Sequence, residues 1–164
     1  RLIEGDILDR DLLERLFEGV DYCFHMAALR ITQCAEKPRE AKDVMLNGTY
    51  NVAEACISNE VKKTILASSA SIYGQASSFP TSEEHPPYNN YTFYGAAKMA
   101  NELMFRSFYE MYGFQYYPAK TSEEIETHLE AFFSDSEKPK LLEIFTPRTV
   151  NDEVLLEYFN FMKS

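Results

Sequence analysis

Tyr94 and Lys98 are residues whose types and spacing could do chemistry. A separation of four places both side chains on the same face of a helix. A free phenol titrates near pH ~10, so a tyrosine acts as a general base near neutrality only when a nearby positive charge stabilises the phenolate. Lys98 can supply that charge. An isolated pair of this kind also arises by chance in structural helices, so other residues must decide between the two interpretations.

A group of serine hydroxyls lies before this pair in the sequence, on the other side of a turn-rich loop. The run Ser68-Ser69-Ala70-Ser71-Ile72-Tyr73-Gly74 leaves a predicted strand over 64–70 and could hydrogen-bond a substrate alcohol. Small residues in His25-Met26-Ala27-Ala28 end the preceding strand, where a ligand could approach the backbone, and Asn47-Gly48-Thr49 lies in the next helix. The first two of these segments lie at the carboxyl ends of predicted strands, where α/β folds keep their reactive groups.

The elements that must position these residues alternate between strand and helix. A strand ending near residue 7 is followed by a helix that Asp9 or Asp11 caps and that ends before Gly19. Apolar patterning then predicts a strand over 20–29, a helix over 39–59, the strand over 64–70, a turn-rich loop over 71–90 and a helix over 94–112. This alternation predicts a parallel sheet covered on both sides.

The pattern changes near residue 114, so we divide the chain into regions 1–114 and 115–164. A Tyr-rich strand opens the second region. The Thr121-Ser122-Glu123-Glu124 sequence is a capping box that predicts a helix start. A strand over 140–146 follows, and a last helix starts at Asn151 or Asp152.

The composition excludes several function classes. The chain carries 26 acidic and 16 basic residues, a formal charge of −10 that repels phosphate backbones and anionic lipids. Nucleic acid and membrane surfaces are therefore not expected partners. The three cysteines show no CxxC spacing and the histidines have no second ligand at metal spacing, so we expect reduced thiols, a cytoplasmic location and no metal site. His25 is expected to be a packed, hydrogen-bonded core histidine.

The serine run together with Tyr-x-x-x-Lys resembles the extended short-chain dehydrogenase/reductases, in particular the NAD-dependent nucleotide-sugar epimerases and dehydratases. The resemblance covers region 1–114 and implies NAD as cofactor and a nucleotide sugar as substrate. It implies that Tyr94 is the catalytic base, that Lys98 holds the nicotinamide ribose and lowers the tyrosine pKa, and that Ser69 binds the reacting oxygen. The remaining cofactor contacts that it implies are Asp6 and Ile7 beside adenine, Ala27 and Ala28 along the cofactor, and Asn47 in support.

Two features refine this expectation. Dehydratase relatives carry an Asp-Glu pair where this chain has Ala70 and Ser71, which favours an epimerase that passes hydride to NAD and back through a keto sugar. The family's glycine-rich pyrophosphate turn is absent, because the six glycines lie at least 14 residues apart. We therefore expect a partial Rossmann-like, doubly wound parallel sheet without its first βαβ strands, an exposed apolar edge, weak NAD binding and impaired activity.

Region 115–164 is similar instead to the carboxyl end of a thiamin-diphosphate enzyme, the menaquinone-pathway SEPHCHC synthase, through its order of strand, helix, strand and helix. That family's diphosphate-binding motif lies upstream of the matching region, so no catalytic residue carries over. The epimerase resemblance implies a homodimer through helices 39–59 and 94–112. The alternatives are a non-catalytic fusion or assembly module and a fragment of a thiamin-diphosphate carboligase.

Overall fold

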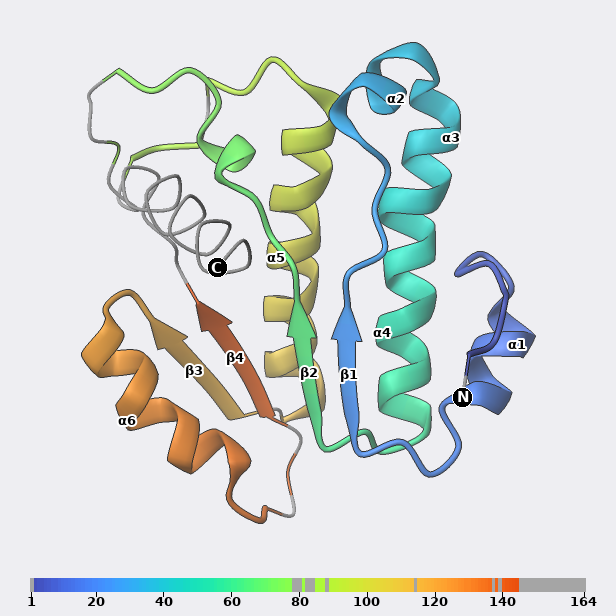
Figure 1. Cartoon of the computed structure of the whole chain (residues 1–164), viewed down its shortest axis with the longest axis vertical. Helices are drawn as coiled ribbons and strands as arrows, with labels where there is room; N and C mark the ends of the chain where they lie inside the picture. Colours follow the sequence, from blue (N-terminus) through green and yellow to red (C-terminus); the bar gives the residue numbers. More distant parts are fainter. Residues whose placement is uncertain are drawn as a thin grey trace, which may run out of the picture.

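Four parallel strands form the sheet in the order β1-β2-β4-β3 (Figure 1). They are β1 (Tyr22–His25), β2 (Lys63–Leu66), β3 (Gln115–Ala119) and β4 (Lys140–Ile144). The computed structural model describes residues 2–77, 81, 85–87, 89–113, 115–136, 138 and 140–144, except for the side chain of Tyr109. The sheet confirms the predicted α/β class with parallel strands.

Strands from both sides of residue 114 share this one sheet. β3 and β4 pair along five residues, from Gln115 with Lys140 to Ala119 with Ile144. β4 also pairs with β2, at Lys63 with Lys140 and at Thr64 with Leu141. The second region therefore extends the sheet from the side of β2 and leaves β1 at the opposite end of the described sheet, where the Phe24 side chain is 62% exposed.

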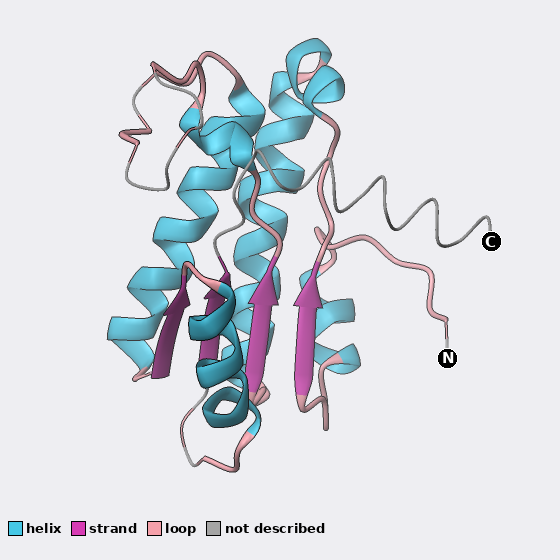
Figure 2. Ribbon diagram, turned by 60° about the vertical axis from the view of Figure 1, so that its left-hand side comes forward, coloured by secondary structure: helices cyan, strands magenta, loops and turns pink. Residues whose placement is uncertain are grey.

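Helices cover both faces of the sheet (Figure 2). On one face lie α5 (Phe93–Tyr112) and a helical stretch made of α3 (Pro38–Lys42), the π-helical turn η1 (Asp43–Gly48) and α4 (Thr49–Ser58). On the other face lies α6 (Ser122–Phe133). The shorter elements are α1 (Arg10–Leu16), which packs on α4, α2 (Ile31–Glu36) and the 3-10 turn η2 (Ala70–Tyr73). No helix within the described ranges is long and apolar enough to cross a bilayer.

The core follows from strand alternation. In β2, Leu66 packs with Phe105 and Phe108 of α5, whereas its neighbour Ile65 packs with Phe132 of α6. Successive side chains of a strand point to opposite faces, so one strand contributes to both helix layers. Burying an aromatic or branched side chain of this kind stabilises the fold by roughly 2 kcal/mol.

Four predicted elements differ from the structure, and two of them are the strands predicted over 20–29 and 64–70, which are shorter, Tyr22–His25 and Lys63–Leu66. Residues 2–7 form no strand, because the described sheet offers them no partner and the carboxylate of Asp6 instead accepts a hydrogen bond from the N–H of Leu8 in a turn, at 2.9 Å. The predicted helix over 39–59 begins at Pro38 and is interrupted by the π-helical turn η1, which contains Gly48. A Cβ atom at position 48 would overlap the side chain of Ile7, so the glycine lets the 2–7 segment lie against the helix. The predicted last helix, from Asn151 or Asp152, lies outside the described residues.

The start of α6 confirms the predicted capping box with one difference. The Thr121 hydroxyl accepts a hydrogen bond from the N–H of Glu124 at 3.1 Å, as the motif requires. The Glu124 carboxylate accepts from the N–H of Lys120 at 2.6 Å, one residue before the cap. Both contacts satisfy backbone donors at the helix entrance and fix where α6 begins.

Candidate functional site

The serine loop after β2 is tied directly to the start of α5. The side-chain amide of Asn90 donates to the carbonyl of Ser71 at 2.8 Å, and its oxygen accepts from the N–H of Thr92 at 3.0 Å. The Thr92 hydroxyl in turn accepts from the N–H of Gly95 at 3.1 Å, in the first turn of α5. These bonds bring the segments that carry Ser69 and Tyr94 together at the carboxyl edge of the sheet.

Gly95 is the point of closest approach between the two segments. A Cβ atom there would overlap the Ser71 carbonyl oxygen and the Asn90 side chain. Backbone atoms cannot move away as easily as the end of a flexible side chain. The glycine therefore allows the helix to start against the serine loop.

We predict that Gly95→Ala destabilises the protein by about 2 kcal/mol, because overpacking against fixed backbone costs roughly 1–3 kcal/mol. At an unobstructed helix position the same change would stabilise by about 1 kcal/mol, so the sign of the effect is diagnostic. Urea unfolding followed by circular dichroism measures it. Gly113→Ala is the control: its Cβ would meet open space, and only the left-handed φ of 71° opposes it, so a loss of about 1 kcal/mol is expected. A more stable Gly95→Ala protein would contradict the close approach.

Lys98 lies one helical turn after Tyr94, with its ammonium near the tyrosine ring. The Lys98 Nζ atom is 5.9 Å from the centroid of the Tyr94 ring and donates to the carbonyl of Ala67 at 2.6 Å, at the end of β2. The lysine is buried, and burial lowers its pKa, while the charge of Glu102 partly opposes this. The predicted pair is thus brought together, with a desolvated cation beside a half-buried phenol ring.

Ser69 lies two residues after Ala67 at the same strand end. Its hydroxyl oxygen accepts a hydrogen bond from the N–H of Ser71 at 3.2 Å and so caps the turn η2. The side chain is half-buried and lines a pocket. A hydroxyl in this position can still donate its own hydrogen to a substrate oxygen.

His25 ends β1 and is 5% exposed. Its Nε2 atom shares a hydrogen bond of 2.9 Å with the Thr49 hydroxyl, which also accepts from the Asn101 amide at 3.3 Å. Burial, and then the charge of Lys98, lower the pKa of His25 to about 4, so the imidazole is neutral near pH ~7. This confirms the predicted packed histidine.

The other expected cofactor residues lie at separate places. Ala27 and Ala28 are exposed just after β1, and Asp6 is exposed in its turn. The Asn47 side chain donates to the Asp43 carboxylate at 3.2 Å on η1. Ile7 packs against Gly48, and its carbonyl accepts from the Asn51 amide at 3.1 Å. The structure draws Tyr94, Lys98 and the serine loop together, whereas Asp6 and Asn47 make only local contacts.

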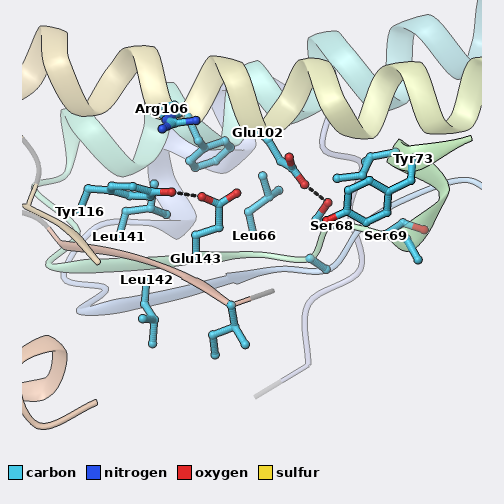
Figure 3. Close-up of a pocket in the computed structure, with 15 residues that line it drawn as sticks. Leu66, Ser68, Ser69, Tyr73, Glu102, Arg106, Tyr116, Leu141, Leu142 and Glu143 are labelled. Carbon is cyan, nitrogen blue, oxygen red and sulfur yellow. Dashed lines mark hydrogen bonds between the residues drawn. The ribbon is translucent and has the colours of Figure 1, made fainter. Parts of the chain in front are cut away.

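A pocket of about 270 Å³ opens between α5 and the sheet, on the side of β4 and β3 (Figure 3). Its apolar lining includes Leu66 and Leu141 from the sheet and Phe105 from α5. Two carboxylates line it: Glu102 accepts a hydrogen bond from the Ser68 hydroxyl, and Glu143 accepts one from the Tyr116 hydroxyl. Ser69 is one of the residues that line the pocket, and the lining includes residues from both region 1–114 and region 115–164.

Sequence reasoning missed these carboxylates. Glu102 and Arg106 continue the four-residue spacing of Tyr94 and Lys98 along α5, a signal that could have found them. Glu143 gave no such signal, because its place depends on β4 entering the sheet beside β2. Burial, with the charge of Glu102, raises the pKa of Glu143 to about 7, and burial also raises the pKa of Glu102. Within the described ranges, no group of three or more His, Cys, Asp or Glu side chains could hold a metal ion.

Comparisons with known proteins fit this geometry. Residues 1–123 match the sequence profile of the "NAD dependent epimerase/dehydratase family". A "Putative UDP-glucose 4-epimerase" of Methanocaldococcus jannaschii is 31% identical over 117 residues, which are 70% of this chain and 38% of that protein. The crystal structure of UDP-glucose 4-epimerase from Bifidobacterium longum, in complex with NAD+ and UDP, aligns with a TM-score of 0.63 and 29% identity, over 71% of this chain and 38% of that one.

A different relative matches a shorter stretch. The 2-succinyl-5-enolpyruvyl-6-hydroxy-3-cyclohexene-1-carboxylate synthase of Christiangramia forsetii is 64% identical over 55 residues, which are 34% of this chain and 10% of that protein. It is the enzyme to which region 115–164 is expected to be similar. The chain therefore spans well under half the length of each of these relatives.

Proposed function

The chain belongs to the NAD dependent epimerase/dehydratase family, and from this we propose that it carries the reactive face of a nucleotide-sugar 4-epimerase. One observation carries the proposal most directly. The Lys98 ammonium lies 5.9 Å from the Tyr94 ring centroid and donates to Ala67, two residues before Ser69. Base, cation and hydroxyl therefore come from one corner of the sheet, the carboxyl edge where α/β folds bind ligands.

In this proposal Tyr94 accepts the proton of the sugar hydroxyl that is oxidised. The Lys98 cation stabilises the phenolate, because a positive charge near an acid favours its ionised form. The Ser69 hydroxyl donates to the same sugar oxygen and holds it during proton transfer. Because His25 is neutral, it does not repel the Lys98 ammonium.

The residues present fit one end of the expected cofactor. Exposed Ala27 and Ala28 leave the backbone after β1 accessible, and the Lys98 ammonium has donors beyond the one bound to Ala67. NAD, when bound, supplies the hydride acceptor at this site. No glycine-rich turn exists for the pyrophosphate, since the glycines are at least 14 residues apart and Ile7 fills the space at Gly48. We therefore propose that this chain alone binds NAD weakly.

The relatives support a uridine-diphosphate sugar as substrate. They are described as UDP-glucose 4-epimerases, and one was crystallised with NAD+ and UDP. Ala70 and Ser71 follow Ser69 without a carboxylate, which favours epimerisation over dehydration. A homodimer through helices 39–59 and 94–112 is part of the same proposal, supported by the exposed apolar side chains of Tyr50, Leu103 and Met111.

Joining a glycine-rich βα unit from a family member ahead of Arg1 tests the proposal. We expect NAD to bind the chain as it stands only weakly in calorimetric titrations, and to bind the completed protein clearly. The completed protein should interconvert UDP-glucose and UDP-galactose, measured by coupled absorbance. A completed protein that is folded and binds NAD but converts neither sugar would refute the proposed function.

A further inference from the structure

The pocket beside α5 has a charge pattern that the proposed epimerase chemistry does not use. Its apolar lining is largely buried, with Leu141 6% and Phe105 6% exposed. Its acidic groups are Glu102 of α5 and Glu143 of β4. Tyr94 and Lys98 do not line it. A nucleotide diphosphate would be repelled by these carboxylates, so the pocket fits a different ligand.

The polar groups around the pocket favour a cation. Glu102 accepts a hydrogen bond from the neutral Ser68 hydroxyl, and Glu143 accepts one from the neutral Tyr116 hydroxyl. A carboxylate can accept further hydrogen bonds beside these. The two carboxylates also repel each other across the pocket, which a positive charge between them would relieve. Aromatic rings of Tyr73 and Tyr116 line the same space and can contact a cation or an apolar group.

The basic groups nearby do not fill that role. Arg106 itself lines the pocket, but its side chain is exposed and its guanidinium lies over the Tyr116 ring at 5.6 Å. Its positive charge lowers the pKa values of both Glu102 and Glu143, yet both pKa values remain raised. The Lys98 ammonium acts on Glu102 but donates to the Ala67 carbonyl. Two partly desolvated carboxylates thus face an apolar space.

We propose that this pocket binds a small primary amine carried on an apolar or aromatic body, with its ammonium group between the carboxylates of Glu102 and Glu143. The body lies on Leu66, Phe105 and Leu141. Because Glu143 comes from β4 and Glu102 from α5, the site exists only where the two sequence regions meet. The inference is independent of the proposed epimerase function.

Benzylamine and benzyl alcohol test this site, because the two probes have nearly the same shape and differ in charge. Titrations of the full chain by calorimetry, with ¹H–¹⁵N NMR to map the contact, should show that benzylamine binds at least about tenfold more tightly than benzyl alcohol, since its ammonium donates charge-assisted hydrogen bonds to the carboxylates. Benzoate should not bind. Ionisation of Glu143 should strengthen benzylamine binding roughly threefold to tenfold between about pH 6 and about pH 8, where the amine stays protonated.

Variants locate the effect. Glu143→Gln should weaken benzylamine about tenfold and leave benzyl alcohol unchanged, whereas Glu126→Gln, on the exposed face of α6, should leave both unchanged. If Glu143→Gln does not fold, Glu102→Gln removes the other carboxylate and serves the same purpose. Equal affinity for the two probes, no binding of benzylamine, or a pocket variant that keeps wild-type affinity would overturn the proposal.

Discussion

Replacing Tyr94 with phenylalanine is expected to lower the kcat of the completed protein for UDP-glucose about 10³-fold, while KM changes little. A positioned acid or base contributes roughly 10²–10⁴-fold to rate, and phenylalanine removes the proton acceptor but keeps the ring that packs with Met45 and Ala97. The folded state should therefore survive the change. Steady-state kinetics on the purified variant measure the effect.

Tyr91→Phe is the matched control. Tyr91 lies three residues earlier, and its side chain is 77% exposed. Loss of its hydroxyl should therefore leave kcat within about twofold of the wild-type value. A second readout separates a base from a structural residue: Lys98→Met should shift the acidic, rising limb of the pH–rate profile to higher pH, because the pKa of Tyr94 rises when the phenolate loses its neighbouring cation. A Tyr94→Phe protein with wild-type kcat would show that another group takes the proton.

Local patterns in the sequence were enough to predict the elements that carry this chemistry. The spacing of Tyr94 and Lys98 placed both on one helix face, and α5 over Phe93–Tyr112 confirms the predicted helix over 94–112. The Thr121 and Glu124 pair predicted the start of α6 to the residue. These signals depend on neighbours within one or two helical turns, which is the range over which sequence spacing fixes geometry.

The sheet order could not be predicted in the same way. β4 pairs between β2 and β3 although it is the last described strand in the chain, and only contacts between distant segments decide that place. The pocket at Glu143 and the Asn90 contacts to Ser71 depend on such contacts too. The segment over 2–7 failed as a strand for the same reason: its apolar residues suit a strand, but pairing needs a partner that the described sheet does not provide.

Lys140 shows how a residue at the start of a predicted apolar strand can become a buried charge. Its side chain is 2% exposed, and the Nζ atom donates to the carbonyls of Ala131 at 2.5 Å and Ser134 at 2.9 Å and to the Ser134 hydroxyl at 2.9 Å. These acceptors lie at the carboxyl end of α6, where the helix dipole favours a cation. β4 thus holds α6 through one ammonium group.

Lys140→Met is expected to destabilise the protein by about 3 kcal/mol, because methionine fills similar space but leaves the partly buried carbonyls of Ala131 and Ser134 without this donor. Urea unfolding followed by circular dichroism should show a lower midpoint. Lys138→Met, two residues earlier on an exposed side chain, should change stability by less than about 0.5 kcal/mol. Equal midpoints for the two variants would mean that α6 ends without help from Lys140, and that apolar packing in the cluster of Phe132 and Leu142 holds α6 on β4.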